Sequence, residues 1–296
     1  MRLCSVRGDD GLFVALRSDD EWVDLTKAIS SASDRFAWVE RCPDITIERI
    51  LNNTPNLVEA LGAFLLDLAA DGRLEQYRIG EPEDLLAPIT RPSKIVALGR
   101  NYAAHAAEAG YEPPEEPVIF AKAPSSIIGP GEEVVNPGSV TRLDPEIEMA
   151  VVLGRRAKDV SEDEAMAYVA GYTILNDMTA RDRQMRDIEA GDPWFLTKSY
   201  DTFTPLGPYL VLTDEVPDPH GLRITLYVDD EVRQDASTSH CIFKTAEIIS
   251  YVSSIMTLEP GDVIATGTPG GIAPVHRGDT MRCVIDGLGT LVNRIA

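Results

Sequence analysis

The chain has 296 residues, an apolar fraction of 44% and a formal net charge of −21. This composition is that of a globular protein and not of a disordered one, and the negative charge argues against nucleic acid or an anionic membrane surface as a partner. No apolar run approaches the ~20 residues of a membrane helix, and the N-terminal residues turn polar too early for a signal peptide. A soluble, cytoplasmic protein is therefore expected.

The N-terminal region is predicted to form a small α/β domain. Apolar residues at 12–16 and 21–25, separated by turn-forming residues, predict a β-hairpin. Leucines recur at helical spacing over residues 57–68 and predict a stripe that faces a core. Three prolines then interrupt a segment without periodicity. This places a domain boundary near residue 90, which gives regions 1–90 and 91–296.

The second region alternates short strands with a few helices. An apolar run at residues 94–98 leads into Gly99-Arg100-Asn101-Tyr102, and the alanine-rich stretch 103–109 predicts a helix that stops at Gly110. Further elements are predicted as strands at residues 149–153, 172–175 and 263–265 and as helices at residues 161–169 and 245–256.

Acidic side chains gather at the ends of two apolar segments. Acidic and apolar residues alternate from Asp144 to Met149, so that a strand would project Asp144, Glu146 and Glu148 from one face. Such a face is usually only solvated, but this one leads into an apolar strand, and its like charges repel unless a cation lies between them. Asp177 ends the second apolar segment, where an unpaired acid is costly. The arrangement suits a hard cation such as Mg²⁺, with Mn²⁺ or Ca²⁺ as alternatives.

A histidine and a lysine are candidates for catalysis. His105 and Glu108 lie three residues apart in a predicted helix and so share a face. A glutamate there raises the basicity of the imidazole and orients it, as a base that activates water requires; a surface pair is the alternative. Lys198 stands among aromatic residues and could supply positive charge to a developing enolate, with a surface lysine as the alternative.

Other polar residues are candidates for contact with a substrate. Arg181 and Gln184 follow Asp177 by four and seven residues, so that a helical turn would stack all three on one side. Lys122 ends an apolar run. The segment from Thr266 to Gly271 follows an apolar strand and could present backbone amides to a carboxylate, or could be a simple tight turn.

The order of these motifs closely resembles that of the fumarylacetoacetate hydrolase superfamily over about residues 92–295. In chain order they are Gly99-Arg100-Asn101-Tyr102 with His105 and Glu108, Asp144-Pro145-Glu146-Ile147-Glu148, Gly171 to Asp177 with Arg181 to Gln184, Lys198-Ser199-Tyr200-Asp201, and Gly261 to Pro269. The resemblance implies an α+β, β-rich catalytic fold of mixed sheets with flanking helices, usually in a homodimer. The region before residue 91 resembles only loosely the variable N-terminal domain of part of the family.

Matching position within these motifs implies the site residues. The implied metal ligands are Glu146, Glu148 and Asp177. The implied catalytic residues are His105 and Glu108, as a pair that activates water, and Lys198, which stabilises charge on the substrate. The residues expected to contact the substrate are Arg181, Gln184 and Thr268, with Lys122 as a further candidate.

The expected activity is metal-dependent hydrolysis of a C–C bond in a 2,4-dioxo acid. Such an acid could resemble acylpyruvate or fumarylacetoacetate, or could be a sugar-derived 2,4-dioxo-3-deoxy acid. The same site could decarboxylate oxaloacetate-like 2-oxo acids or isomerise hydroxydienoates, and of these reactions only hydrolysis needs an activated water. A protein that binds metal and ligand without catalysis is a further alternative, which the presence of His105, Glu108 and Lys198 disfavours.

Overall fold

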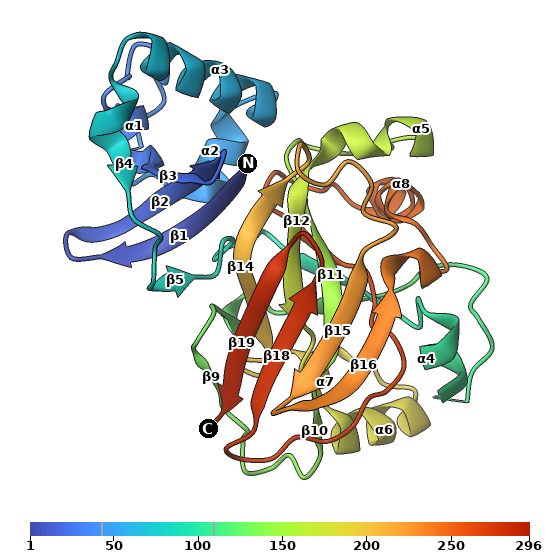
Figure 1. Cartoon of the computed structure of the whole chain (residues 1–296). Coiled ribbons are helices and arrows are strands. Elements are labelled where there is room, and N and C mark those ends of the chain that lie inside the picture. Colours follow the sequence, from blue (N-terminus) through green and yellow to red (C-terminus); the bar gives the residue numbers. More distant parts are fainter. Residues whose placement is uncertain (43, 109) are drawn as a thin grey trace.

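The computed structural model describes residues 1–42, 44–108 and 110–296. Over this part of the chain strands outnumber helices, and they form a long sheet, a five-stranded sheet and a two-stranded ribbon. The predicted α+β fold rich in β-structure is confirmed. The N-terminal unit (residues 1–90) lies at the upper left of Figure 1, and the remainder of the chain lies below and to the right.

The N-terminal unit contains the predicted hairpin and the predicted helix. Strand β2 (Gly11–Ser18) pairs antiparallel with β3 (Glu21–Asp24), and Leu16 lies opposite Val23. Helix α3 (Leu57–Ala70) buries the predicted leucine stripe. The other elements of this unit are β1 (Arg2–Gly8), α1 (Leu25–Ser30), α2 (Ile47–Asn53), η1 (Leu74–Tyr77), β4 (Arg78–Ile79) and β5 (Leu85–Leu86).

The sheet of the N-terminal unit continues into the rest of the molecule. Strand β1 pairs with β14 (Thr204–Leu212), where Leu3 lies opposite Leu210. From β14 the same sheet continues through five further strands of the second region. One apolar cluster also includes side chains from both regions, such as Leu61 and Val263. Because backbone pairing and core packing both cross it, the boundary near residue 90 stays a prediction.

The central strands of this sheet carry the predicted site motifs. Strands β11 (Ile147–Leu153) and β12 (Val169–Asn176) pair antiparallel and are buried along their whole length. Strand β17 (Val263–Ala265) pairs with β11 and runs parallel to β6 (Ile95–Gly99), which pairs with β7 (Val118–Lys122). Strands covered on both faces need apolar residues throughout, which explains their near-continuous apolar sequences.

A five-stranded sheet packs in front of these strands in Figure 1. Both sheets contribute to the largest apolar cluster, for example Val151 from β11 and Leu226 and Leu291 from the five-stranded sheet. The members of that sheet are β16 (Glu231–Ser237), β15 (Arg223–Val228), β18 (Thr280–Ile285), β19 (Gly289–Ile295) and β9 (Glu133–Val134).

Two predicted helices are found and one is shorter than predicted. Helices α4 (Ala103–Glu108) and α8 (Thr245–Ile255) match the prediction, although Ala109 lies outside the described residues. The helix predicted at 161–169 is limited to α5 (Glu162–Ala165) and the turn η3 (Met166–Tyr168), because strand β12 begins at Val169. Pairing of that strand between β11 and β14 outweighs local helix propensity. The remaining elements are η2 (Pro124–Ser126), β8 (Ile127–Ile128), β10 (Leu143–Asp144), β13 (Thr179–Ala180), α6 (Arg181–Ala190), α7 (Phe195–Lys198) and η4 (Thr238–His240).

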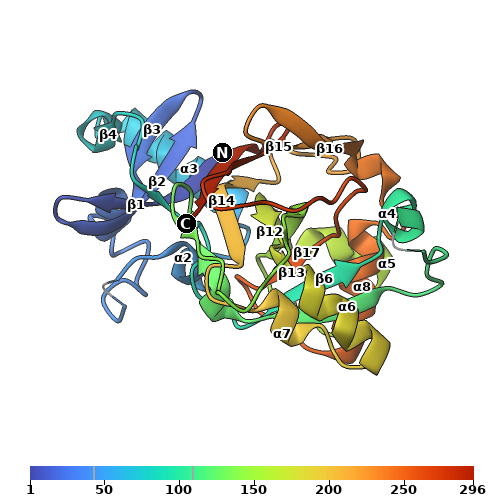
Figure 2. The ribbon, with the colours of Figure 1, turned by 90° about the horizontal axis from the view of Figure 1, so that it is seen from below.

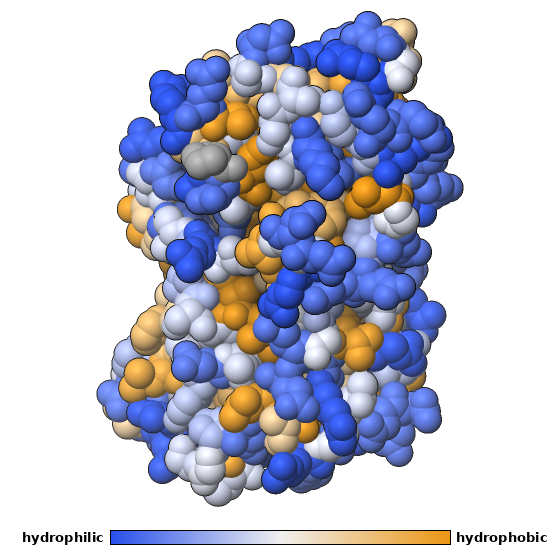
Figure 3. All heavy atoms as spheres, turned by 90° about the vertical axis from the view of Figure 1, so that its left-hand side faces the viewer, coloured by the Kyte–Doolittle hydropathy of each residue, from blue (hydrophilic) through white to orange (hydrophobic). Residues whose placement is uncertain are grey.

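The surface on the side of the N-terminal unit is mainly hydrophilic, and its apolar patches are separated by polar side chains (Figure 3). Within the described residues, no helix has both the length and the apolar character needed to cross a membrane. The homodimer and the cytoplasmic location stay predictions.

Candidate metal centre and active site

The ends of β11 and β12 bring the three predicted metal ligands together. Asp177 directly follows β12, and its N–H donates to the carbonyl of Glu146 at 2.8 Å. Glu148 lies within β11. All three side chains are buried, and one carboxylate oxygen from each lies within 4.8 Å of the others. Acids that are distant along the chain therefore converge on one point.

Asp144 departs from the expected pattern. The alternating segment was expected to be one strand with a single acidic face, and this expectation is wrong. Asp144 belongs to the short strand β10, and β11 begins only after Glu146. Pro145 lies between them, and it has no N–H with which to continue a ladder. The buried carboxylate of Asp144 instead accepts two hydrogen bonds of 3.0 Å from Arg142 and one of 2.8 Å from Arg181.

Two buried lysines compensate the charge of the carboxylates. Lys198, the last residue of α7, donates to Glu146 at 2.8 Å and to Asp177 at 2.5 Å. Lys122 donates to the other oxygen of Asp177 at 2.6 Å and to the carbonyl of Lys198 at 2.5 Å. Lys122 is buried behind Asp177 and does not line the neighbouring cavity. Its place in the structure supports a role in holding Asp177, and does not favour the predicted contact with substrate.

Arg181 links three side chains of the site. Its guanidinium donates from Nε to Asp144, from Nη1 to Gln184 at 2.5 Å and from Nη2 to Glu146. Asp177 was expected to share a helical turn with Arg181 and Gln184, but α6 begins only at Arg181, after the short strand β13. Both residues still reach the site, because α6 starts beside the acidic cluster.

The balance of charge differs among the buried groups. Burial opposes ionisation of Glu146, but Lys198 and Arg181 outweigh it and lower the pKa of this carboxyl. Burial also opposes the positive charge of Lys198. The negative charges of Asp177 and Glu146 outweigh this effect of burial and raise the pKa of the Lys198 ammonium. Burial, and then the charge of Asp177, raise the pKa of Glu148 well above its ordinary value.

This donor set fits a divalent metal ion. The partner of Glu148 is the N–H of Gly267 at 2.6 Å, and no cationic side chain within the described residues forms an ion pair with it. A buried carboxylate without a countercharge is costly, and a cation between Glu148, Glu146 and Asp177 would remove that cost. An all-oxygen cluster suits Mg²⁺ or Mn²⁺ and not zinc.

His105 and Glu108 share one face of α4 as expected, but they are not hydrogen bonded. Nδ1 of His105 lies 3.8 Å from Oε2 of Glu108, and the same oxygen accepts the N–H of Gly271 at 3.0 Å. Nδ1 is buried and has no hydrogen-bond partner among the described residues. Burial lowers the pKa of His105, although the charge of Glu146 opposes this. The imidazole is therefore neutral at neutral pH.

The glycine-rich loop after β17 binds carboxylates with two of its backbone amides, whereas contact of this loop with a substrate carboxylate stays a prediction. These carboxylates belong to the chain itself, since Gly267 donates to Glu148 and Gly271 donates to Glu108. Gly271 has a φ of +102°, and a Cβ at this position would lie 2.2 Å from the carbonyl oxygen of Arg233. Only glycine can bring this amide to Glu108.

Thr268 is positioned by a residue that the sequence analysis missed. The side chain of Gln234, from β16 of the five-stranded sheet, donates to the hydroxyl of Thr268 at 2.9 Å and accepts the N–H of Ile147 at 3.0 Å. It thus connects the loop to the start of β11. Nothing in the local sequence around Gln234 marks this role, because the contact depends on how the two sheets pack.

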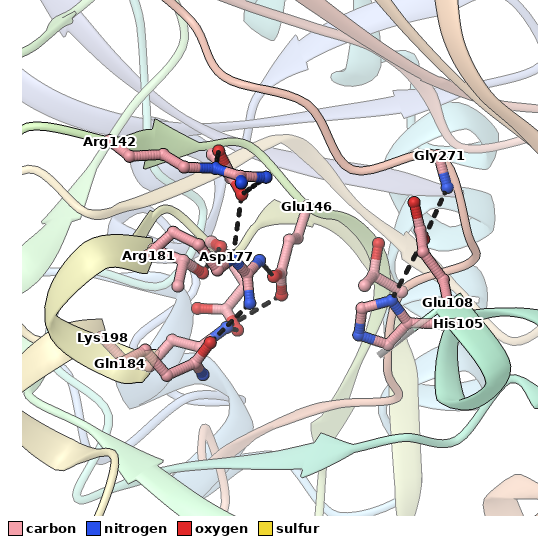
Figure 4. Close-up of polar contacts among 12 residues, drawn as sticks. His105, Glu108, Arg142, Glu146, Asp177, Arg181, Gln184, Lys198 and Gly271 are labelled. Carbon is pink, nitrogen blue, oxygen red and sulfur yellow. Dashed lines mark hydrogen bonds and ion pairs between the residues drawn. The ribbon is translucent and has the colours of Figure 1, made fainter. Parts of the chain in front are cut away.

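A cavity of about 510 Å³ opens beside the acidic cluster. It is bounded by α4, α6, α7 and the end of β6, which gather at one end of the molecule (Figure 2). The imidazole of His105 faces Glu146, Asp177 and Lys198 across an open space (Figure 4). The predicted site residues that line this cavity are His105, Glu108, Glu146, Glu148, Arg181, Gln184, Lys198 and Thr268.

The fold and this buried acidic site define a metal-dependent enzyme of a known family. A family model described as fumarylacetoacetate (FAA) hydrolase C-terminal matches residues 94–296. The chain belongs to the fumarylacetoacetate hydrolase family, as its motifs indicated.

Relatives of this chain carry the names of different activities. A human protein named oxaloacetate tautomerase FAHD2A, mitochondrial, is 46% identical over 217 residues, which are 71% of this chain and 68% of that protein. The structure of a 2-hydroxyhepta-2,4-diene-1,7-dioate isomerase from Mycobacterium marinum is similar over 100% of this chain and 98% of its own, with 31% identity and a TM-score of 0.73. The structure of maleylpyruvate hydrolase from Sphingobium sp. SYK-6 in complex with manganese(II) ion and pyruvate is similar over 100% of this chain and 99% of its own. Its sequence identity to this chain is 31% and the TM-score is 0.78.

Proposed function

We propose that this protein is a divalent-metal-dependent isomerase that interconverts the keto and enol forms of an oxaloacetate-like 2-oxo acid. The sequence favoured hydrolysis and kept decarboxylation of oxaloacetate-like 2-oxo acids and isomerisation of hydroxydienoates as alternatives. The comparisons support isomerisation better than hydrolysis. The human relative at 46% identity is named an oxaloacetate tautomerase, and the similar structure from Mycobacterium marinum is named an isomerase. The metal we propose is Mg²⁺ or Mn²⁺, since a related structure contains manganese with pyruvate.

One observation carries this proposal, namely that the neutral imidazole of His105 faces the buried ammonium group of Lys198 across the cavity (Figure 4). Moving a proton between carbon and oxygen requires a base of suitable pKa and a positive charge near the oxygen. His105 supplies the first and Lys198 the second. The reaction does not require a carboxylate that hydrogen bonds to the base, and Glu108 does not form that bond here.

The roles of the side chains follow from their positions. Glu146, Glu148 and Asp177 would hold the metal ion, which when bound would polarise the 2-oxo group and neutralise the adjacent carboxylate. The imidazole of His105 takes a proton from the carbon beside the oxo group in one direction and returns it in the other. The ammonium of Lys198 balances the negative charge that develops on the substrate oxygen and gives that oxygen a proton to form the enol. Exchange through water then passes the proton of the His105 imidazolium back to Lys198, so that no proton is gained or lost.

Hydrolysis of a 2,4-dioxo acid is a second candidate, and one distance favours it. Oε2 of Glu108 lies 3.8 Å from Nδ1 of His105, so that a small movement would form the pair that activates water. A related structure is that of a maleylpyruvate hydrolase. In this reaction His105 would take a proton from water, and Glu108 would stabilise the resulting imidazolium.

The disappearance of enol-oxaloacetate, followed by its ultraviolet absorbance, tests the proposal. The purified protein is expected to accelerate it with Mg²⁺ or Mn²⁺ and to lose that effect with a chelator. His105→Gln should lower kcat about 100-fold or more, whereas the matched control His276→Gln, which changes an exposed histidine, should not. Acceleration that survives complete chelation would contradict the proposal. Much faster cleavage of acylpyruvates than tautomerisation would favour the second candidate.

A further inference from the structure

Arg100 lies on the cavity wall with a backbone that its neighbours hold in place. Its φ of +59° is in the left-handed region, where residues other than glycine persist only if the surroundings fix them, often at functional sites. On one side, Gly99 packs so closely on Trp194 that a Cβ would lie 2.6 Å from the indole ring. On the other side, the buried amide of Asn101 donates to the carbonyl of Thr266 at 2.7 Å.

Arg100 also differs from the other cations of the cavity because it forms no ion pair with a carboxylate among the described residues. Arg142 and Arg181 pair with Asp144, and Lys198 pairs with Glu146. Within the described residues, Arg100 has no carboxylate within 4.0 Å. The chain as a whole has a net charge of −21. A cation beside a cavity that has no carboxylate partner of its own is placed to bind an anion that enters from solution.

The guanidinium of Arg100 is held by an aromatic ring. It lies 4.6 Å from the centroid of the Tyr111 ring, at the range of a cation–π contact. Its Nε is buried and has no hydrogen-bond partner among the described residues. Stacking on a face leaves the two terminal Nη groups at the edge of the planar fork available, and together they can bind a carboxylate.

We propose that Arg100 binds the remote carboxylate of a dicarboxylic 2-oxo acid. This rests on the proposed function, in which the 2-oxo-carboxylate end occupies the acidic cluster and its metal ion. Arg100 then selects substrates with a second carboxylate, and Tyr111 positions its guanidinium. The cavity, at about 510 Å³, is of a size that holds molecules larger than a four-carbon acid, so that longer dicarboxylic 2-oxo acids fit as well.

Calorimetric binding to the Mn²⁺-loaded protein tests this assignment. The probes are pyruvate, which has one carboxylate, and oxaloacetate, 2-oxoglutarate and 2-oxoadipate, which have two. The wild type is expected to bind at least one dicarboxylate about tenfold or more tightly than pyruvate, and Arg100→Gln should remove most of this advantage. Its affinity for pyruvate should change less than about threefold.

Two further variants keep the test decisive if Arg100→Gln fails to fold. Arg100→Lys retains the charge but not the fork, and Tyr111→Leu removes the ring. Each is expected to reduce the preference for dicarboxylates by a smaller factor. Arg142→Gln is the matched control, because Arg142 lines the same cavity but pairs with Asp144. A selective loss of dicarboxylate binding in Arg142→Gln, and not in the Arg100 variants, would overturn the assignment.

The outcomes separate this inference from the proposed function. If the metal-loaded wild type tautomerises oxaloacetate but binds no dicarboxylate better than pyruvate, the role of Arg100 is refuted and the proposed function stands. Equal losses for pyruvate and dicarboxylates in Arg100→Gln would refute the role as well, because a general disturbance of the cavity would explain them. If the wild type neither tautomerises oxaloacetate nor binds pyruvate in the presence of metal, the proposed function itself fails.

Discussion

Oε2 of Glu108 accepts a hydrogen bond of 3.0 Å from the N–H of Gly271. The same oxygen lies 3.8 Å from Nδ1 of His105. This relationship joins the helix that carries the proposed base to the loop that also binds Glu148 through Gly267. Glu108 is therefore an anchor of the loop in addition to a candidate partner of His105.

Substitution of Glu108 separates the two candidate reactions. Glu108→Gln retains an oxygen that accepts the N–H of Gly271 but removes the charge that would stabilise an imidazolium. Tautomerisation should remain within about threefold of the wild type, whereas any hydrolysis of acylpyruvates should fall about 100-fold. Parallel kcat measurements on both substrates check this. Equal losses in both reactions would show that His105 depends on Glu108 in each of them.

The pH dependence of the reaction should report the burial of His105. Burial lowers the pKa of its imidazole from the ordinary value of 6.5, and a base must be neutral to accept a proton. The rate should therefore be constant near neutral pH and fall as the pH drops through the lowered pKa, which places the acidic limb of kcat/KM below pH 6.5. An acidic limb above that value in the metal-loaded protein would contradict this role.

The uncompensated carboxylate of Glu148 makes the stability of the protein depend on metal. The metal-free protein should melt at a lower temperature than the Mn²⁺-loaded protein, because the ion binds only the folded state. Glu148→Gln replaces a buried carboxyl, whose ionisation is disfavoured by burial and by the charge of Asp177, with a neutral side chain, so that it should stabilise the metal-free form by about 1 kcal/mol. The same variant should lose the rise in Tm caused by Mn²⁺. Differential scanning calorimetry of both proteins, with and without Mn²⁺, measures the two effects.

Asp144 should contribute to stability through the two arginines that it binds. Asp144→Asn removes the countercharge of the half-exposed Arg142 and one of the two carboxylates that bind the buried Arg181. The loss of one partner of a buried pair costs about 3 kcal/mol, and the remaining pair of Arg181 with Glu146 makes this the upper end of the expected effect. Denaturant unfolding checks this value. Asp235→Asn is the matched control, because its pair with Arg223 lies on the surface and should change stability little. A similar small effect at Asp144 would mean that water replaces the lost contacts.

The fold class could be predicted from the order of the motifs, through the family that they resemble. The convergence of Glu146, Glu148 and Asp177 could be predicted because apolar strands and acids at their ends are local patterns. In the structure, His105, Lys198 and Thr268 from these motifs line one cavity, and their roles in catalysis or substrate binding stay predictions. The role of Pro145 in separating Asp144 from the following strand was present in the sequence, since proline cannot donate to a ladder, but the acidic alternation obscured it.

Other features could not be predicted because they depend on packing between distant elements. Gln234 reaches Thr268 only because the two sheets face each other. The position of Lys122 behind Asp177, and not beside the cavity, depends on how α7 packs on β7. The oxygen of Glu108 is engaged by Gly271, which is 163 positions away in the chain.

The pairing of β1 with β14 has a consequence for producing the family-matched part of the chain alone. A fragment of residues 94–296 would lose β1 and expose the backbone N–H and C=O groups of β14 near Leu210 and Val211. An unpaired edge of this kind, flanked by apolar side chains, is a template for pairing with another chain. Expressed without the N-terminal unit, the catalytic region should therefore self-associate through this edge.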